Sequence, residues 1–229
     1  MMTKLTLSKA PYPEDVEVLL KTLFGAGFFQ SGVLIGSWVM PLYRKLFGLQ
    51  YALKTFDIDF AVEAAVAGRS GGIIDLEKIL VDVCYVILTD YDTGLRKFSK
   101  GGFEVEFLCH RRGGRDIPKL DLKHWNITAV TLPFIDILFQ YPLELSFADY
   151  EIRIPCPEAL FIHKLIIAQR RTGSTKSEND LAQGRCIAAI LDPARLSRIL
   201  KSLKLSGRTR KQMEVSCEAI HFPPQNILL

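Results

Sequence analysis

Asp57 and Asp59 are two residues apart in a segment, residues 56–62, in which acidic and apolar side chains alternate. An alternation with a period of two predicts a β-strand with both carboxylates on one face. Two carboxylates on one face raise each other's pKa unless a positive charge lies between them. A divalent cation such as Mg²⁺ or Mn²⁺ would supply that charge, because hard cations bind carboxylate oxygens. The pair predicts a metal site; the alternative is a surface strand with two solvated aspartates.

Gly36 and Ser37 lie at the exit of an earlier apolar segment that begins at Gly32, and a predicted helix follows them. We expect Ser37 to be the first residue of that helix. The first amides of a helix and the positive end of its dipole favour an anion such as phosphate. The order strand, turn, helix, strand therefore predicts a phosphate site beside the aspartate pair, which indicates phosphoryl or nucleotidyl transfer.

Gly36-Ser37 followed by Asp57-x-Asp59 resembles the signature of the polymerase-β-type nucleotidyltransferase superfamily. The segment from Thr55 to Phe60 is similar to one bacterial branch of predicted nucleotidyltransferases. The resemblance implies an α+β protein with the nucleotidyltransferase fold, a small mixed β-sheet flanked by helices, followed by a helical C-terminal domain. It also implies transfer of a nucleoside monophosphate from a nucleoside triphosphate, with Mg²⁺ or Mn²⁺ as the cofactor.

A change in composition marks the boundary between two expected domains. Residues before Pro155-Cys156-Pro157 are rich in predicted strands, whereas only helices are predicted after them. We therefore expect a nucleotidyltransferase-like catalytic domain over residues 1–155 and a helical domain over residues 156–229.

A third acidic residue is expected on the strand that ends near residue 109. Relatives that share the aspartate pair have such a residue just before a short apolar pair, and Glu106 matches that position by resemblance. Glu104 lies on the same face of the strand, about 7 Å away, so the pattern does not exclude it. The resemblance makes Asp57, Asp59 and Glu106 both the catalytic residues and the metal ligands.

The helix predicted to begin at Pro157 has a lysine, Lys164, at the edge of its apolar stripe, where it needs a counter-charge or a path to solvent. By resemblance, Lys164 and Lys176 would contact the triphosphate together with Gly36 and Ser37, and Asp180 would orient a lysine or close the site. The alternative for Asp180 is a capping box that begins at Ser177.

His110, Arg111, Arg112 and Arg115 follow the strand that carries Glu106 and form a basic loop with two glycines. Arginine side chains bind phosphate well through two parallel hydrogen bonds. The loop would contact substrate, or it would be a solvated surface.

The 229 residues are 48% hydrophobic and 24% charged, with a formal net charge of +4. These values are typical of an ordinary globular protein and permit binding of a polyanion without arguing for it. No segment approaches the roughly 20 apolar residues that span a membrane, and the N-terminus lacks the pattern of a signal peptide. Five scattered cysteines without a Cys-x-x-Cys pair indicate reduced thiols. We expect a cytoplasmic protein with no membrane partner.

Three functions are consistent with these patterns. The leading one is a magnesium-dependent nucleotidyltransferase whose partners are a nucleoside triphosphate and a hydroxyl acceptor: a small molecule, a protein or an RNA. The second is a nucleotide-binding or interaction protein that kept the fold and lost catalysis, against which the intact aspartate pair argues. The third is a toxin-like enzyme that modifies RNA, such as the 3′ end of a tRNA, and it predicts a basic surface near the site.

Overall fold

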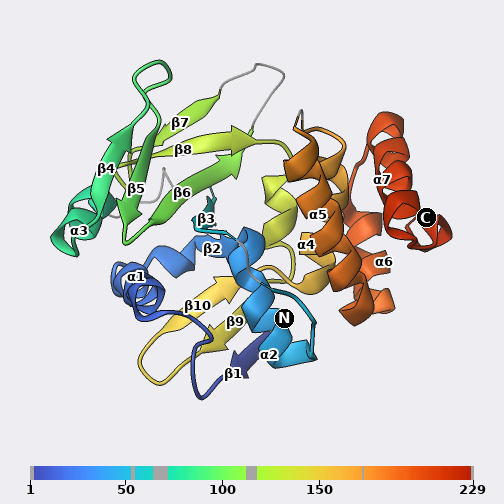
Figure 1. Cartoon of the computed structure of the whole chain (residues 1–229), viewed down its shortest axis with the longest axis horizontal. Coiled ribbons are helices and arrows are strands. Elements are labelled where there is room, and N and C mark those ends of the chain that lie inside the picture. Colours follow the sequence, from blue (N-terminus) through green and yellow to red (C-terminus); the bar gives the residue numbers. More distant parts are fainter. Residues whose placement is uncertain (1–2, 53–54, 64–71, 112–117, 172, 228–229) are drawn as a thin grey trace.

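A mixed β-sheet forms the N-terminal part of the molecule in the computed structural model, which describes residues 3–52, 55–63, 72–111, 118–171 and 173–227 (Figure 1). The strand order is β2-β3-β6-β5-β4, with β8 pairing β6 and β7 pairing β8. The strands are β2 (Gly32–Ile35), β3 (Asp57–Val62), β4 (Val86–Thr89), β5 (Arg96–Lys100), β6 (Phe103–His110), β7 (Lys119–Leu122) and β8 (Ile127–Leu132).

Strands β3 and β6 lie in the middle of this sheet and run parallel, whereas β2 is antiparallel to β3. Ile58 and Phe60 from β3, and Val105 and Phe107 from β6, are buried, as the alternation predicts. The Phe28 ring packs beneath them, with its centroid 5.6 Å from those of Phe60 and Phe107. One face of β3 and β6 is therefore fixed in the core, which leaves the opposite face for the acidic side chains.

A second, smaller sheet contains β1 (Thr3–Thr6), β9 (Leu143–Ser146) and β10 (Glu151–Ile154). Strand β1 is parallel to β9, and β10 is antiparallel to it. Helices α1 (Glu14–Gly25), α2 (Met40–Phe47) and α3 (Leu76–Asp82) accompany the two sheets. Short 3₁₀ turns span Phe28–Gln30, Gly36–Val39 and Ile135–Phe139.

Helices α4 (Pro157–Ala168), α5 (Ser174–Ile187), α6 (Pro193–Ser202) and α7 (Gly207–Ile220) follow in the C-terminal part, with 3₁₀ turns at Ala188–Ile190 and Pro224–Asn226. Every residue of α4 is buried, because α5, α6 and α7 surround it. Asp192 and Ser206 cap α6 and α7 with hydrogen bonds from the first backbone amides. Figure 1 shows this helical part beside the ends of β6 and β8.

The α+β fold class expected from the sequence is confirmed. One local prediction was wrong: Ser37 lies in a 3₁₀ turn, and α2 begins three residues later, at Met40. Pro41 suits the first turn of α2, because proline lacks the amide that would stay unpaired there.

All five cysteines lie within the described residues, and none of them forms a disulfide. Within the described ranges, no helix is long and apolar enough to cross a membrane.

Candidate active site

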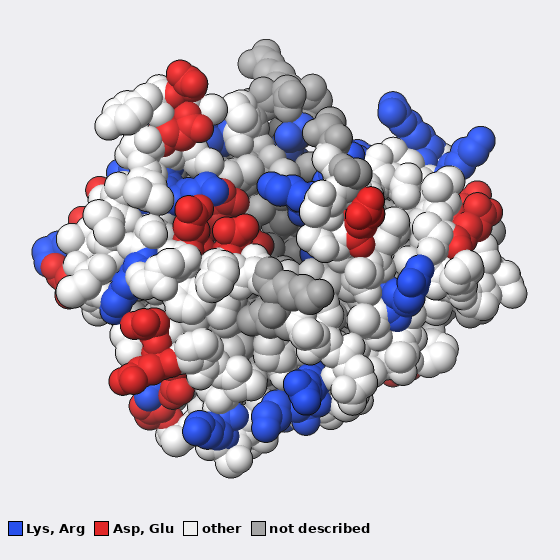
Figure 2. Space-filling model, in the orientation of Figure 1, with Lys and Arg blue, Asp and Glu red and all other residues white. Residues whose placement is uncertain are grey.

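The parallel pairing of β3 with β6 brings the acidic residues of the two strands into register. Asp57 lies opposite Glu104, and Asp59 lies opposite Glu106. All four line one cleft of about 660 Å³, together with residues of α5 and the turn that contains Ser37. On the face of the molecule drawn in Figure 2, acidic side chains gather in a hollow, and basic side chains lie beside them.

Asp59 is the least exposed of the acidic pair. Burial, followed by the negative charges of Glu106 and Asp57, raises the pKa of Asp59 from 3.8 to about 6. Lys164 and Arg171 act in the opposite direction through their positive charges. The cleft therefore concentrates negative charge around a carboxyl group that gains from any added cation.

Lys97 of β5 already supplies one cation. Its ammonium Nζ lies 2.8 Å from Glu106 Oε1 and 3.4 Å from Glu104 Oε2. Glu104 and Glu106 both point into the cleft. The direction of their side chains therefore does not decide which of them is the third acidic residue of the site. The shorter contact and the position opposite Asp59 set Glu106 closer to the buried centre.

The donor set of the cleft matches a hard divalent cation by type, because carboxylate oxygens are the ligands that Mg²⁺ and Mn²⁺ take. Within the described residues, no group of three His, Cys, Asp or Glu side chains is arranged to hold a metal ion. Asp57 and Asp59 both line the cleft, and the raised pKa of Asp59 agrees with a cation beside them. Asp57 and Asp59 would be its ligands, and Glu106 would join them once released by Lys97.

The turn at Gly36 approaches Asp59 closely. Gly36 has a φ of +68°, a conformation that favours glycine. A Cβ atom at this position would lie 2.7 Å from Asp59 Oδ2, well inside the contact distance. Ile35, just before the turn, pairs with Asp59 between β2 and β3. The backbone of the turn therefore forms one wall of the space around the Asp59 carboxylate.

Lys164 reaches the same cleft from α4 and is 7% exposed. Its ammonium donates a hydrogen bond of 2.6 Å to Asp180 Oδ1 of α5. The other oxygen of Asp180 lies 2.5 Å from Arg171 Nε. The counter-charge that Lys164 requires is thus Asp180. The capping-box alternative for Asp180 was wrong, because α5 begins at Ser174 and Ser177 Oγ donates instead to the Ala168 carbonyl.

Other residues of α5 complete the wall opposite the carboxylates. Gln183 Nε2 donates hydrogen bonds to Ser37 Oγ at 2.7 Å and to the Tyr51 hydroxyl at 3.1 Å. Lys176 is exposed at the rim. Gly36, Ser37, Lys164, Lys176 and Asp180 therefore line the same cleft as Asp57, Asp59 and Glu106.

The basic loop expected after β6 is described only in part. His110 Nδ1 lies 3.0 Å from Asp136 Oδ1, and Arg111 Nη2 donates to the Thr131 carbonyl. Arg112 and Arg115 lie outside the described residues.

The sequence reasoning missed Lys97, Arg171 and Gln183. Lys97 had a usable signal: Phe98 pairs with Val105 in the core, so the neighbouring Lys97 must share the outward face of Glu104 and Glu106. Gln183 had no such signal, because its partners are more than one hundred residues earlier in the chain.

The comparison with protein families matches residues 14–206 to a family described as nucleotidyltransferase. The chain belongs to the nucleotidyltransferase family. The matched range contains the whole cleft and confirms the resemblance to polymerase-β-type nucleotidyltransferases. A comparison with curated protein sequences finds no match.

Several solved structures have similar chains at low sequence identity. The solution structure of the antibiotic-resistance factor ANT(2'')-Ia is 15% identical, with 91% of this chain and 98% of that chain covered and a TM-score of 0.47. The crystal structure of ANT(2'')-Ia with adenylyl-2''-tobramycin is 14% identical, with coverage of 82% and 95% and a TM-score of 0.46. An antigenic nucleotidyltransferase-like protein from Paracoccidioides brasiliensis is 13% identical, with coverage of 92% and 95% and a TM-score of 0.41.

Proposed function

We propose that this nucleotidyltransferase transfers a nucleoside monophosphate from a nucleoside triphosphate to a hydroxyl acceptor, with Mg²⁺ or Mn²⁺. The observation that supports it most is the register of β3 and β6, which aligns Asp59 with Glu106 in a cleft that also contains Ser37 and Lys164. A transfer site needs carboxylates for cations and positive groups for a triphosphate, and residues of both kinds line this cleft.

The residues of the sheet would bind the reacting end of the nucleotide. Asp57 and Asp59, with Glu106, would hold the divalent cations, which lower the pKa of the acceptor hydroxyl and neutralise charge on the triphosphate. The backbone and hydroxyl at Gly36-Ser37 would hold terminal phosphate oxygens, so that the α-phosphate lies in line with the acceptor.

The residues of the helical part would bind the rest of the triphosphate. Lys164 would donate to phosphate oxygens while Asp180 orients its ammonium, and Lys176 would approach from the exposed rim. Gln183 would fix the rotamer of Ser37 Oγ through its hydrogen bond. This division supports a catalytic domain over residues 1–155 and a helical domain over residues 156–229 that closes the site.

A labelling experiment tests the proposal. The purified protein is incubated with MgCl₂, each of the four nucleoside triphosphates labelled at the α-phosphate, and cell extract separated into RNA, protein and small-molecule fractions. We expect a labelled product in one fraction with one preferred nucleotide, and loss of that product with EDTA. Asp59→Asn should abolish it. Asp121→Asn, which changes an exposed strand aspartate outside the cleft, should not.

One observation favours a second candidate, a nucleotide-binding protein without catalysis. Lys97 pairs with both glutamates of the cleft and so competes with a cation for Glu106. This candidate predicts nucleotide binding that does not require a divalent cation, and no labelled product in any fraction.

A further inference from the structure

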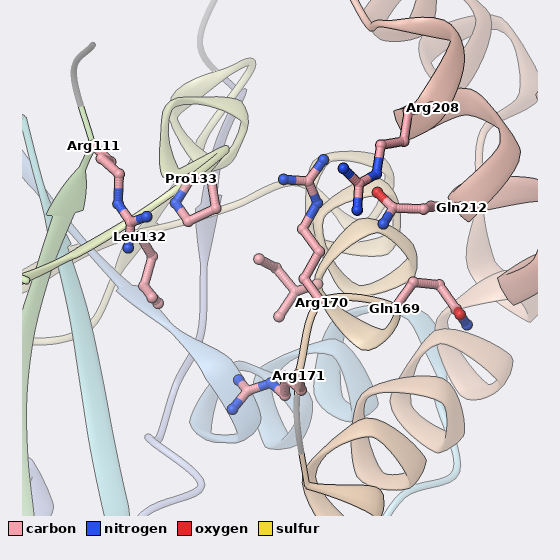
Figure 3. A pocket seen from close by; sticks show the side chains of 9 residues that line it. Arg111, Leu132, Pro133, Gln169, Arg170, Arg171, Arg208 and Gln212 are labelled. Atoms are coloured by element: carbon pink, nitrogen blue, oxygen red, sulfur yellow. The ribbon is translucent and has the colours of Figure 1, made fainter. Parts of the chain in front are cut away.

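A second pocket, which we call the arginine pocket, adjoins the carboxylate cleft. It encloses about 540 Å³, and Leu132 and Arg171 line both spaces. Four of its nine lining residues are arginines, and none of the nine is acidic (Figure 3). The arginines are Arg111, Arg170, Arg171 and Arg208. The charged side chains that line this pocket are therefore all positive, beside the proposed site of transfer.

Three parts of the chain deliver these arginines to one place. Arg111 directly follows β6, Arg170 and Arg171 lie in the turn after α4, and Arg208 lies in the first turn of α7. Figure 3 shows the side chains of Arg170 and Arg208 extending toward each other from the turn and from α7. No acidic residue occurs in the first turn of α7 to offset them.

Arg170 is held in place by neutral partners. Its guanidinium lies 4.7 Å from the centroid of the Phe134 ring, and Nη2 donates a hydrogen bond of 3.0 Å to Thr209 Oγ1. Burial and the positive charge of Arg208 both lower the pKa of Arg170. The guanidinium groups of Arg170 and Arg208 repel each other, and an anion bound between them would offset this repulsion.

The other two arginines are already engaged on the side of the cleft. Arg171 is paired with Asp180, and Arg111 donates to the Thr131 carbonyl. Arg170 and Arg208 therefore present the charge that an incoming anion would meet first. Guanidinium groups match phosphate in shape and charge, since each offers two parallel N–H donors.

We propose that the arginine pocket binds a phosphate group of the acceptor, so that the acceptor is a phosphorylated molecule whose hydroxyl extends into the carboxylate cleft. This inference rests on the proposed function. Lys164 and Lys176 line the cleft but not the arginine pocket, so the triphosphate would have its own cations within the cleft. Such a phosphate would come either from a nucleic acid backbone or from a small phosphorylated molecule.

Binding without nucleotide or metal tests the pocket separately from catalysis. A short fluorescein-labelled single-stranded RNA is titrated with the full chain in EDTA, and inorganic phosphate is then added as a competitor. The variant is Arg208→Gln, because Arg208 is exposed and its loss should not disturb the core. The matched control is Lys211→Gln, an exposed cation of the same helix outside the pocket. Binding of ATP with Mg²⁺ is measured for each protein.

We expect Arg208→Gln to weaken binding of the phosphate ligand about tenfold, the worth of one charge-assisted hydrogen bond, while Lys211→Gln and ATP binding stay within about twofold of wild type. If wild type binds the RNA and Arg208→Gln loses that binding, the phosphate comes from a nucleic acid backbone. If RNA does not bind, and inorganic phosphate raises the melting temperature of the wild-type protein but not that of Arg208→Gln, the source is a small phosphorylated molecule.

Three results would overturn the assignment: equal losses in the two variants, a loss of ATP affinity in Arg208→Gln as large as the loss of RNA affinity, or no binding of either probe. A wild-type protein that binds phosphate through Arg208 but transfers no label would refute the proposed function and leave the phosphate site standing.

Discussion

At the scale of single residues, the chemistry of the cleft depends on how Asp59 is surrounded. It is opposite Glu106 on one side and against the Gly36 backbone on the other. Its pKa is about 6 in the folded protein, compared with 3.8 for an ordinary aspartate, so the folded state binds a proton at this carboxyl group more tightly than the unfolded chain does. The apo protein therefore carries an electrostatic cost at neutral pH that a bound cation would relieve.

The pH dependence of stability should report this cost. Folding raises the pKa of Asp59 from 3.8 to about 6, so between these values the folded state binds more protons than the unfolded state. The free energy of unfolding then falls as pH rises through the window. Asp59→Asn should be more stable than wild type above the window by about 1 kcal/mol, and equally stable below it. Urea unfolding in EDTA measures both, with Asp121→Asn as the control. A variant less stable than wild type at neutral pH would make Asp59 a structural residue.

Lys97 offers a second test at the same scale. Because its ammonium occupies Glu106 and Glu104, removing it should free these oxygens for a divalent cation. We expect Lys97→Gln to raise Mn²⁺ affinity severalfold, by about 0.5–1 kcal/mol, in calorimetric titrations of the full chain. Lys78→Gln, which breaks an exposed ion pair on α3, is the control. Unchanged or weaker Mn²⁺ binding in Lys97→Gln would argue that Glu106 is not a metal ligand.

At the scale of elements, the turn at Gly36 is the feature that should tolerate a side chain least. Gly36 and Gly48 have similar φ values, +68° and +73°, but only Gly36 faces the Asp59 carboxylate, and a Cβ at Gly48 has nothing within 4 Å. Gly48→Ala should lose about 1 kcal/mol of stability from backbone strain alone. Gly36→Ala should lose more and also weaken nucleotide binding, because the new methyl group displaces Asp59. Equal losses in urea unfolding, with equal nucleotide affinity, would refute a role for the close approach.

Lys164 of α4 and Asp180 of α5 form an ion pair, and variants of the two residues distinguish a role in nucleotide binding from a role in stability. Lys164→Met removes a charge from an apolar helix and should weaken ATP binding by about 1.5–3 kcal/mol with a smaller effect on stability. Asp180→Asn leaves the ammonium buried without its counter-charge and should lose about 3 kcal/mol of stability. Glu178→Gln, an exposed residue of α5, controls for the loss of an acidic group. Calorimetry and urea unfolding give the two quantities, and unchanged ATP affinity in Lys164→Met would reduce the pair to a structural contact.

The elements differ in how far their sequence reveals them. Strands β3 and β6 were predictable because Ile58, Phe60, Val105 and Phe107 alternate with acidic residues. Strand β8 was not predicted, because it is buried on both faces and so lacks the alternation of apolar and acidic residues that reveals β3 and β6. Strand β1 was missed because it is only four residues long and is held in place by its pairing with β9, whose register joins Leu5 to Leu145. Local patterns carry no information about such contacts.

At the scale of the whole molecule, the site is made where the sheet meets the helical part. Gln183 contacts Ser37 and Tyr51 across this boundary, and Lys164 brings a cation to Asp59. Sequence motifs identified the acidic residues on β3 and β6, the Gly36 turn, and Lys164, Lys176 and Asp180 of the cleft, because each motif lies on one element. The relation between elements, including the hydrogen bond from Gln183 to Ser37 and the arginine pocket, depends on tertiary packing and appears only in the structure.

The most direct test of the central claim follows two labels on one nucleotide. The wild-type protein, with MgCl₂ and the reactive extract fraction, is given the preferred nucleoside triphosphate labelled at either the α- or the γ-phosphate. If the cleft of Asp57 and Asp59 catalyses nucleotidyl transfer, α-label enters the acceptor, γ-label leaves as pyrophosphate, and Asp59→Asn loses the product while Asp121→Asn keeps it. Incorporation of γ-label, or α-label transfer that survives Asp59→Asn, would contradict the account.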